Sequence, residues 1–133
     1  MTAAERQRLI EVRRALLHLH KTLLDRERAA YERVHGRTPP AELLNIIVRD
    51  PQFSWLRPFS ELIVRIDESL EIDALDGPEI DFDDIVAQTR MLVLPTDHES
   101  AYAQRYHAAL QEQPDAVLAH RAVTTALKGT AEK

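Results

Sequence analysis

The feature that most constrains the fold is a long amphipathic stretch at the start of the chain, from about Thr2 to His35. Its apolar residues recur every three or four positions, the period of an α-helix, and Gly36 provides a natural end. At about 1.5 Å per residue this helix is roughly 50 Å long, so no later helix can cover it alone. Either the next two expected helices, at about 39–49 and 56–72, share its length, or a second copy of the chain covers the excess. The apolar residues form two lines: Leu9, Val12, Leu16, Leu19, Leu23, Ala30 and Val34, and beside them Ile10, Leu17, Leu24 and Tyr31.

The rest of the sequence also predicts helices. The 133 residues include only three glycines and no Asn-Gly turn, which disfavours β-hairpins, and the apolar residues keep the helical period. Capping residues and prolines set the expected boundaries. Thr38 is the expected N-cap of the second helix, Asp81 that of the fourth, and Thr96 with Glu99 the capping box of the fifth. These helices are expected at about 39–49, 56–72, 81–94, 97–112 and 114–128.

Together these patterns predict an all-α fold, a helical bundle of four main helices plus short accessory helices. One domain covers residues 1–133, and about 129–133 form a frayed tail. The longest apolar runs, such as Ile46 to Val48, are far shorter than the roughly 20 residues of a membrane-spanning helix, and the N-terminus is not signal-like. We therefore expect a cytoplasmic protein with no membrane segment.

Known catalytic and metal-binding motifs are missing from the sequence. With no cysteine, thiolate metal sites and cysteine nucleophiles are excluded. Glycine loops for phosphate and Gly-x-Ser-x-Gly elbows are absent too. A di-metal bundle needs two Glu-x-x-His pairs, and the chain has only Glu32 with His35. The acidic run near Gly77 does not fit the spacing of a calcium-binding EF-hand, because Ile72 takes the first ligand position. We predict no metal and no cofactor, and whether the chain is an enzyme stays open.

Charge is distributed unevenly along the chain, whose net charge is -5. Residues 1–37 carry nine Lys or Arg against five acids, whereas residues 67–84 carry nine acids and no base. Every basic stretch has acids mixed in, so nucleic-acid binding through the arginines of the first helix is disfavoured. We interpret the asymmetry as a basic helix that docks near an acidic segment, within one chain or between two.

The segment DPQFSWLRPFSELIVRIDE, residues 50–68, resembles a family of small uncharacterised bacterial proteins, a domain of unknown function. The resemblance extends over residues 16–71, a little under half of the chain. It implies a bacterial helical protein, and it supplies no activity, cofactor or site residue.

A row of polar residues on the first helix is the main candidate ligand site. Arg13, His20 and Glu27 follow one another at seven-residue spacing and project between the two apolar lines, toward the centre of a bundle, where ligand sites are usually built. Asp67 lies at the edge of the apolar face of the helix at 56–72 and could meet this row across the core. The four residues would form an interior polar network that binds a small ligand or fixes the helix register. The alternative, which we prefer on sequence alone, is that the row lies in a dimer groove or in water.

Aromatic residues near the chain's only tryptophan are candidates for an interaction surface. Phe53, Trp55 and Arg57 form this set, because Trp and Arg are favoured at interface hot spots. Their spacing favours a core position for Trp55 and Phe59, and Phe53 is the residue expected to be exposed. Our leading hypothesis is a non-enzymatic interaction module that forms a homodimer or binds a protein partner. The alternative is a small-ligand binder or enzyme that uses the polar row.

Overall fold

The first helix, α1 (Ala3–His35), begins and ends where the sequence predicts. Thr2 is its N-cap: the Thr2 hydroxyl accepts from the backbone N–H of Glu5 at 3.0 Å, and the Glu5 carboxylate accepts from the backbone N–H of Thr2 at 2.9 Å. The helix ends at Gly36, whose positive φ of 81° suits glycine and whose N–H donates to the carbonyl oxygen of Glu32.

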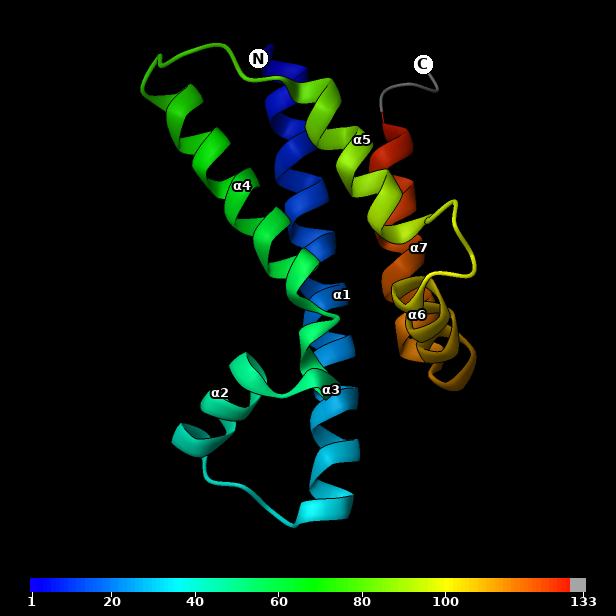
Figure 1. The fold of residues 1–133 in the computed structure, drawn as a ribbon. Coiled ribbons are helices and arrows are strands. Elements are labelled where there is room, and N and C mark those ends of the chain that lie inside the picture. Colours follow the sequence, from blue (N-terminus) through cyan, green and yellow to red (C-terminus); the bar gives the residue numbers. More distant parts are fainter. Residues whose placement is uncertain (130–133) are drawn as a thin grey trace.

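The chain continues through six further helices in the computed structural model, which describes residues 1–129 (Figure 1). Residues 1–129 contain no strand, so the all-α prediction is confirmed. Of the predicted frayed tail, 129–133, only Gly129 lies among the described residues. The remaining helices are α2 (Pro40–Arg49), α3 (Pro51–Ser54), α4 (Arg57–Ala74), α5 (Phe82–Val93), α6 (Ala101–Glu112) and α7 (Pro114–Lys128).

Two of the expected helix caps are wrong. α6 begins at Ala101 with Ser100 as its N-cap, four residues after the start expected from Thr96 and Glu99. The carboxylate of Asp97 accepts from the backbone N–H of Glu99 at 3.1 Å, and this local turn replaces the predicted capping box. The second wrong cap is Thr38: the N-cap of α2 is Pro39, and no side chain caps this helix. The Asp81 cap is confirmed, because its carboxylate accepts from the N–H of Asp84 at 3.0 Å.

Four helices surround the main core. α1 packs against α7 on one side and α4 on the other, and α5 packs against both α4 and α7, which closes a ring (Figure 1). The first apolar line of α1 is completely buried inside this ring from Leu9 to Leu23, as its spacing predicts, whereas Val34 farther along the line is 78% exposed. Tyr106, Phe59, Ile66, Ile85, Val93, Val123 and Leu127 supply much of the rest of this core.

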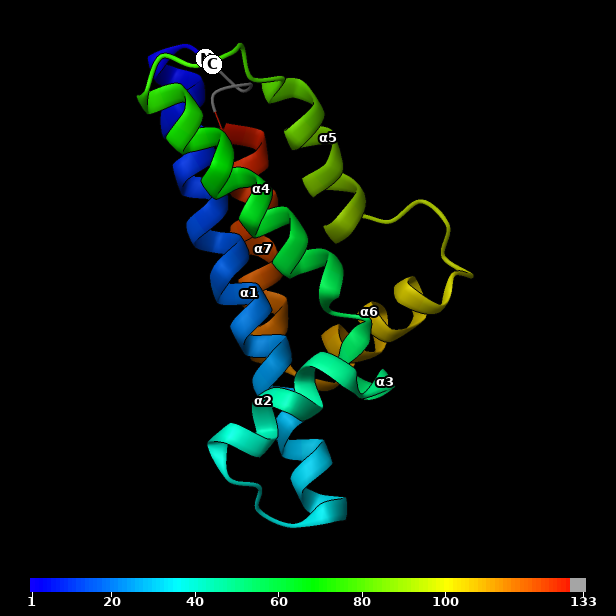
Figure 2. The same cartoon turned by 60° about the vertical axis from the view of Figure 1, so that its left-hand side comes forward.

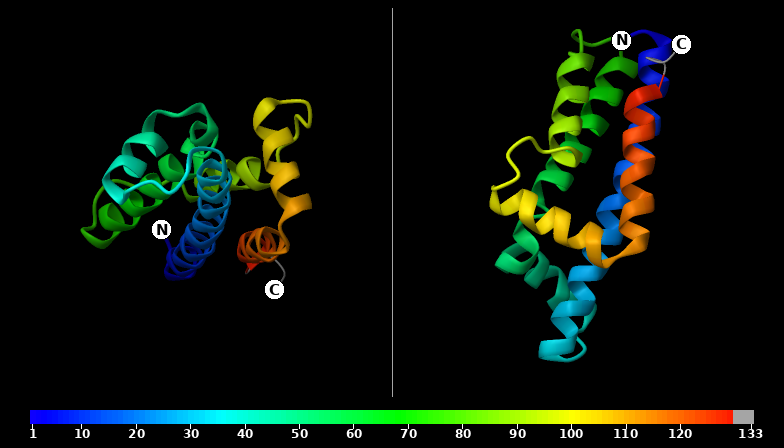
Figure 3. Two further views of the ribbon diagram at one scale, coloured as in Figure 1. Left: turned by 90° about the horizontal axis from the view of Figure 1, so that it is seen from below. Right: turned by 90° about the vertical axis from the view of Figure 1, so that its right-hand side faces the viewer.

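The lower part of α1 extends beyond this ring. α3 packs against it and α2 packs against α3 (Figure 2), while α4 covers the part of α1 inside the ring. The end of α1 near Val34 stays exposed, so the two helices expected to share its length do so only in part. α6 runs across the direction of the longer helices and meets α7 (Figure 3, right). The structure thus places the segment 40–56 next to the middle of α1, where the predicted site residues lie.

Candidate functional site

The residues of the predicted polar row separate into three places. Arg13 on α1 meets Asp67 on α4, as the register of the two helices predicted, and the Nε of Arg13 donates to the carboxylate of Asp67. Both side chains are more than a third exposed, so this ion pair lies at the surface edge between α1 and α4. An exposed pair of this kind contributes about 0–1 kcal/mol to stability.

Glu27, the third member of the row, is buried by α3 and by its neighbour Arg26. Its carboxylate accepts from Arg26 Nη1 at 2.7 Å and from Gln52 Nε2 at 3.3 Å, and the same Gln52 nitrogen donates to the carbonyl oxygen of Glu27 at 3.1 Å. Arg26 also donates to the carboxylate of Glu112 at the end of α6. Glu27 is therefore a buried charge with partners. Its contact with Gln52 ties α1 to α3, and the pair of Arg26 and Glu112 ties α1 to α6.

His20 lies between these two contacts and belongs to neither. Its half-buried ring stacks on Phe59 of α4 with 6.0 Å between the ring centroids, and burial lowers its pKa, which keeps the imidazole neutral at pH 7. Over the described residues 1–129, no hydrogen bond or ion pair joins His20 to the other predicted row members. Seven residues fall slightly short of two helical turns of 3.6 residues, so a heptad row drifts by about 20° per heptad around a straight helix, and different neighbours cover its two ends.

The aromatic candidates are buried. Phe53 is 2% exposed, so the expectation that it is exposed is wrong: it packs beneath α2 and against Tyr31 of α1, with 5.9 Å between the ring centroids. Trp55 is 9% exposed and packs against Tyr102, and its buried indole Nε1 has no hydrogen-bond partner among residues 1–129. Of the three, only Arg57 is exposed, and it donates to the carbonyl oxygen of Val48 at 3.5 Å.

A small recess joins His20, Phe53 and Arg57 at the junction of α1, α2 and α4. Its volume is about 180 Å³. Phe53 and Leu56 form its buried floor, and Val48 and Arg57 stand on its exposed rim. We call this hollow the α2 recess; it is lined by His20, Leu24, Ile47, Val48, Phe53, Ser54, Leu56, Arg57 and Ser60.

The exposed face of α2 continues from the rim of this recess. The sequence patterns described above did not predict this surface. Leu44 is 65% exposed and Val48 is 59% exposed, one helical turn apart. Leu43 on the opposite side is buried. The composition of α2 could have indicated an exposed apolar face, because five of its ten residues are large and apolar, which is too many for one buried stripe on a short helix.

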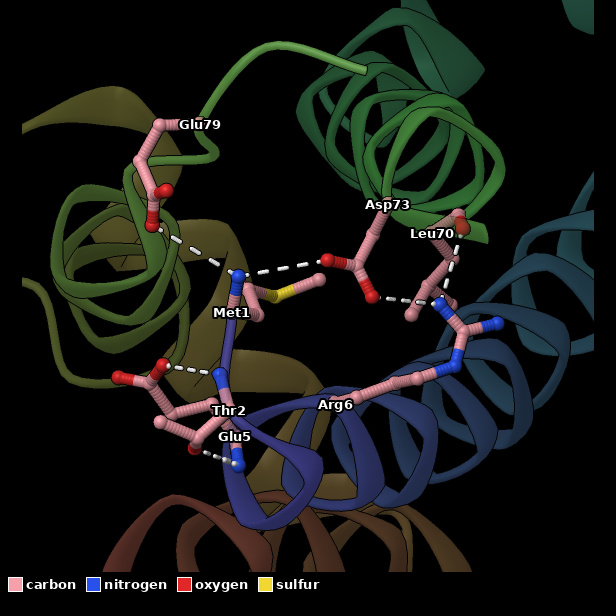
Figure 4. A network of polar contacts seen from close by, with 7 residues as sticks. All are labelled: Met1, Thr2, Glu5, Arg6, Leu70, Asp73 and Glu79. Atoms are coloured by element: carbon pink, nitrogen blue, oxygen red, sulfur yellow. Dashed lines mark hydrogen bonds and ion pairs between the residues drawn. The ribbon is translucent and has the colours of Figure 1, made fainter. Parts of the chain in front are cut away.

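The acidic segment meets the basic helix at the other end of the ring. Arg6 Nη1 donates to Asp73 Oδ2 and to the carbonyl oxygen of Leu70, both at 3.0 Å, and the Met1 ammonium lies 3.3 Å from Asp73 Oδ1 (Figure 4). Glu79 approaches the same ammonium at 3.7 Å. The hydrogen bond from Arg6 holds the pKa of Asp73 below its usual value. Basic and acidic segments therefore pair within one chain, one of the two arrangements that the charge asymmetry allowed.

Comparisons with known proteins leave the site without a precedent. No family model matches the chain, and no curated protein and no solved structure matches it either. The resemblance of residues 50–68 to an uncharacterised bacterial family stays a prediction. Within residues 1–129, no helix has both the length and the apolar character needed to cross a membrane. No group of three or more His, Asp or Glu side chains in this part of the chain is placed to hold a metal ion.

Proposed function

We propose that this protein is an interaction module that forms a homodimer through the exposed face of α2. The ring of α1, α4, α5 and α7 would be a four-helix bundle that serves as the scaffold, while α2 presents the contact surface. The observation that carries the proposal is the pair Leu44 and Val48, two large apolar side chains that are mostly exposed on one short helix. Burying each of them stabilises a complex by about 1.5–3 kcal/mol before the cost of association.

The chemistry of this face favours a second copy of the chain as the partner. Ala41, Leu44 and Val48 are all exposed and follow the spacing of a helix–helix seam, and none of them is charged. A two-fold contact brings the same patch from both subunits together, so an uncharged apolar seam meets an equal seam and leaves no buried charge without a partner. The rim of the α2 recess, next to Val48, gives the partner's side chains a place to insert.

The alternative function, small-ligand binding through the polar row, has less support. Arg13 and Asp67 pair at the surface, Glu27 is held by Gln52 and Arg26, and only His20 lines a recess. A ligand there would have about 180 Å³, and His20 would be the single member of the polar row to recognise it, beside Ser54, Arg57 and Ser60 of the lining. We therefore place the interaction face first.

Native mass spectrometry and light scattering of the purified chain test the proposal. The wild type is expected to be a dimer, and the double variant Leu44→Glu, Val48→Glu is expected to be a folded monomer with an unchanged circular dichroism spectrum. Leu118→Glu on α7 is the matched control, since Leu118 is also 65% exposed. A monomeric wild type, or a dimer that survives the double substitution, would refute the proposal. A monomer with added ligand mass would favour the alternative.

A further inference from the structure

A second pocket lies where the connection between α5 and α6 folds over α6 and α7, away from the α2 recess. Its volume is about 420 Å³. Three of the six histidines of the chain line it, although they are far apart in the sequence. We call it the histidine pocket; its lining residues are Val93, Leu94, Pro95, Thr96, His98, His107, Leu110 and His120.

The three imidazoles come from three different elements and form a connected cluster. His98, on the connection, stacks on His107 of α6 with 5.5 Å between the ring centroids and 26° between the ring planes. His120 of α7 meets Tyr106, whose hydroxyl oxygen is 2.6 Å from His120 Nδ1. Tyr106 also contacts His107, with 6.4 Å between the rings. The phenol thus links the two helices that carry the cluster.

The lining contains no charge that could balance a protonated imidazole. α5 contributes Val93 to the lining, α6 contributes His107 and Leu110, and α7 contributes His120, with no carboxylate among the lining residues of any of these helices. The acids nearest in sequence, Asp97 and Glu99, flank His98 on the connection, and their side chains are exposed.

The protonation state of His120 follows from this surrounding. Burial, and after it the proximity of His107, lowers the pKa of His120, so the imidazole is neutral at pH 7. Burial raises the pKa of Tyr106, so its phenol keeps its proton. The phenol can therefore donate to Nδ1 of the neutral ring and accept from it when the ring is protonated. In both states, Nε2 of His120 is left as an N–H donor.

We infer that the histidine pocket binds a small oxyanion, a phosphate or carboxylate group, with His98, His107 and His120 as its N–H donors. An anion supplies a counter-charge that the lining lacks, which favours the imidazolium form of each ring and gives each ring an acceptor for one N–H. The apolar residues Val93, Leu94 and Leu110 would hold the remainder of an organic anion. Three histidines without a metal arrangement and without a carboxylate suit an anion better than a cation.

Proton linkage gives the proposal a specific signature. Because the anion prefers the charged rings, anion binding takes up protons. The affinity for the anion therefore rises as the pH falls through neutrality, by up to about tenfold per pH unit for each histidine that is protonated on binding. Binding must also raise the pKa of these three histidines, while the exposed His18 and His35 on α1 stay unchanged.

Histidine NMR titrations of the full chain, with and without inorganic phosphate, test the inference. Acetate in a parallel titration distinguishes a carboxylate from a phosphate as the preferred group. We expect a higher pKa for His98, His107 and His120 with one of the anions, and a fall in affinity of about tenfold or more in His107→Gln. His98→Gln lies on the exposed connection and tests the same loss without altering a helix, and His35→Gln is the control that should keep the binding.

Three results would overturn the inference. These are histidine titrations that neither anion changes, an equal effect of the anions on His18 and His35, and wild-type affinity in both His98→Gln and His107→Gln. A shift produced by Zn²⁺ but by neither anion would also overturn it, since the pocket would then be a cation site.

Discussion

One amide nitrogen of Gln52, on α3, donates to two oxygens of Glu27, on α1: the backbone carbonyl at 3.1 Å and the carboxylate at 3.3 Å. This contact fixes the short helix α3 against the lower part of α1. It also gives the buried carboxylate a second donor besides Arg26.

Replacing Gln52 by Leu is expected to destabilise the protein by about 1–3 kcal/mol, because the carboxylate of Glu27 would lose one of its donors in a buried position. Urea denaturation followed by circular dichroism measures this change. Gln111→Leu is the control, since Gln111 lies exposed on α6 and should change stability by less than about 0.5 kcal/mol. Equal effects of the two substitutions would show that the Gln52 contact adds nothing to stability.

The ion pair between Arg13 and Asp67 is expected to contribute little, despite its place between two main helices. Both side chains are more than a third exposed, and solvent screens such pairs. A double-mutant cycle with Arg13→Ala and Asp67→Ala should give a coupling free energy below about 1 kcal/mol, reduced further by salt. A coupling of several kcal/mol would mean that the pair is buried in solution, as the interior network required.

Stability is expected to fall as the pH drops through the region of histidine titration. Burial lowers the pKa of His20 and of His120 in the folded state, so the unfolded chain binds protons more readily once the pH approaches the ordinary histidine value of about 6.5. The contribution of these two groups is complete above that value, and it is lost as the pH falls toward the lowered pKa values of the folded state. Urea midpoints measured on either side of this window will show the loss.

His20→Leu separates the contribution of His20 from that of His120. The variant should unfold at nearly the wild-type midpoint at neutral pH, because His20 makes its contact by stacking on Phe59. It should lose less stability at acidic pH. His18→Leu, on the exposed side of α1, is the control and should keep the wild-type pH dependence. An unchanged pH dependence in His20→Leu would mean that His20 is solvated in the folded state.

Local sequence patterns predicted the helices well, because local interactions set their ends. The expected end of α1 at Gly36 and the expected cap at Asp81 both depend on residues within a few positions of one another. The register of α1 against α4 was also predictable, and it places Asp67 beside Arg13. The start of α6 was not, because the Asp97 side chain makes a turn that competes with the capping box.

Which side chains are exposed, and which ones cluster, was much harder to predict, since both depend on tertiary packing. Phe53 is buried because α2 folds back over it, and no local pattern around Phe53 encodes that contact. His98, His107 and His120 lie on a loop and two helices at spacings that fit no local motif. Only the crossing of α6 against α7 brings them to one pocket.

α1 is one uninterrupted helix that takes part in the buried ring and also supports the projecting α2 and α3 (Figure 1). Leu44 and Val48 therefore stand outside the main core, and substitutions there leave the packing of Leu9 to Leu23 untouched. The surface that α2 presents is thus separable from the ring that folds the chain, and substitutions there can change what this helix contacts while the packing inside the ring stays the same.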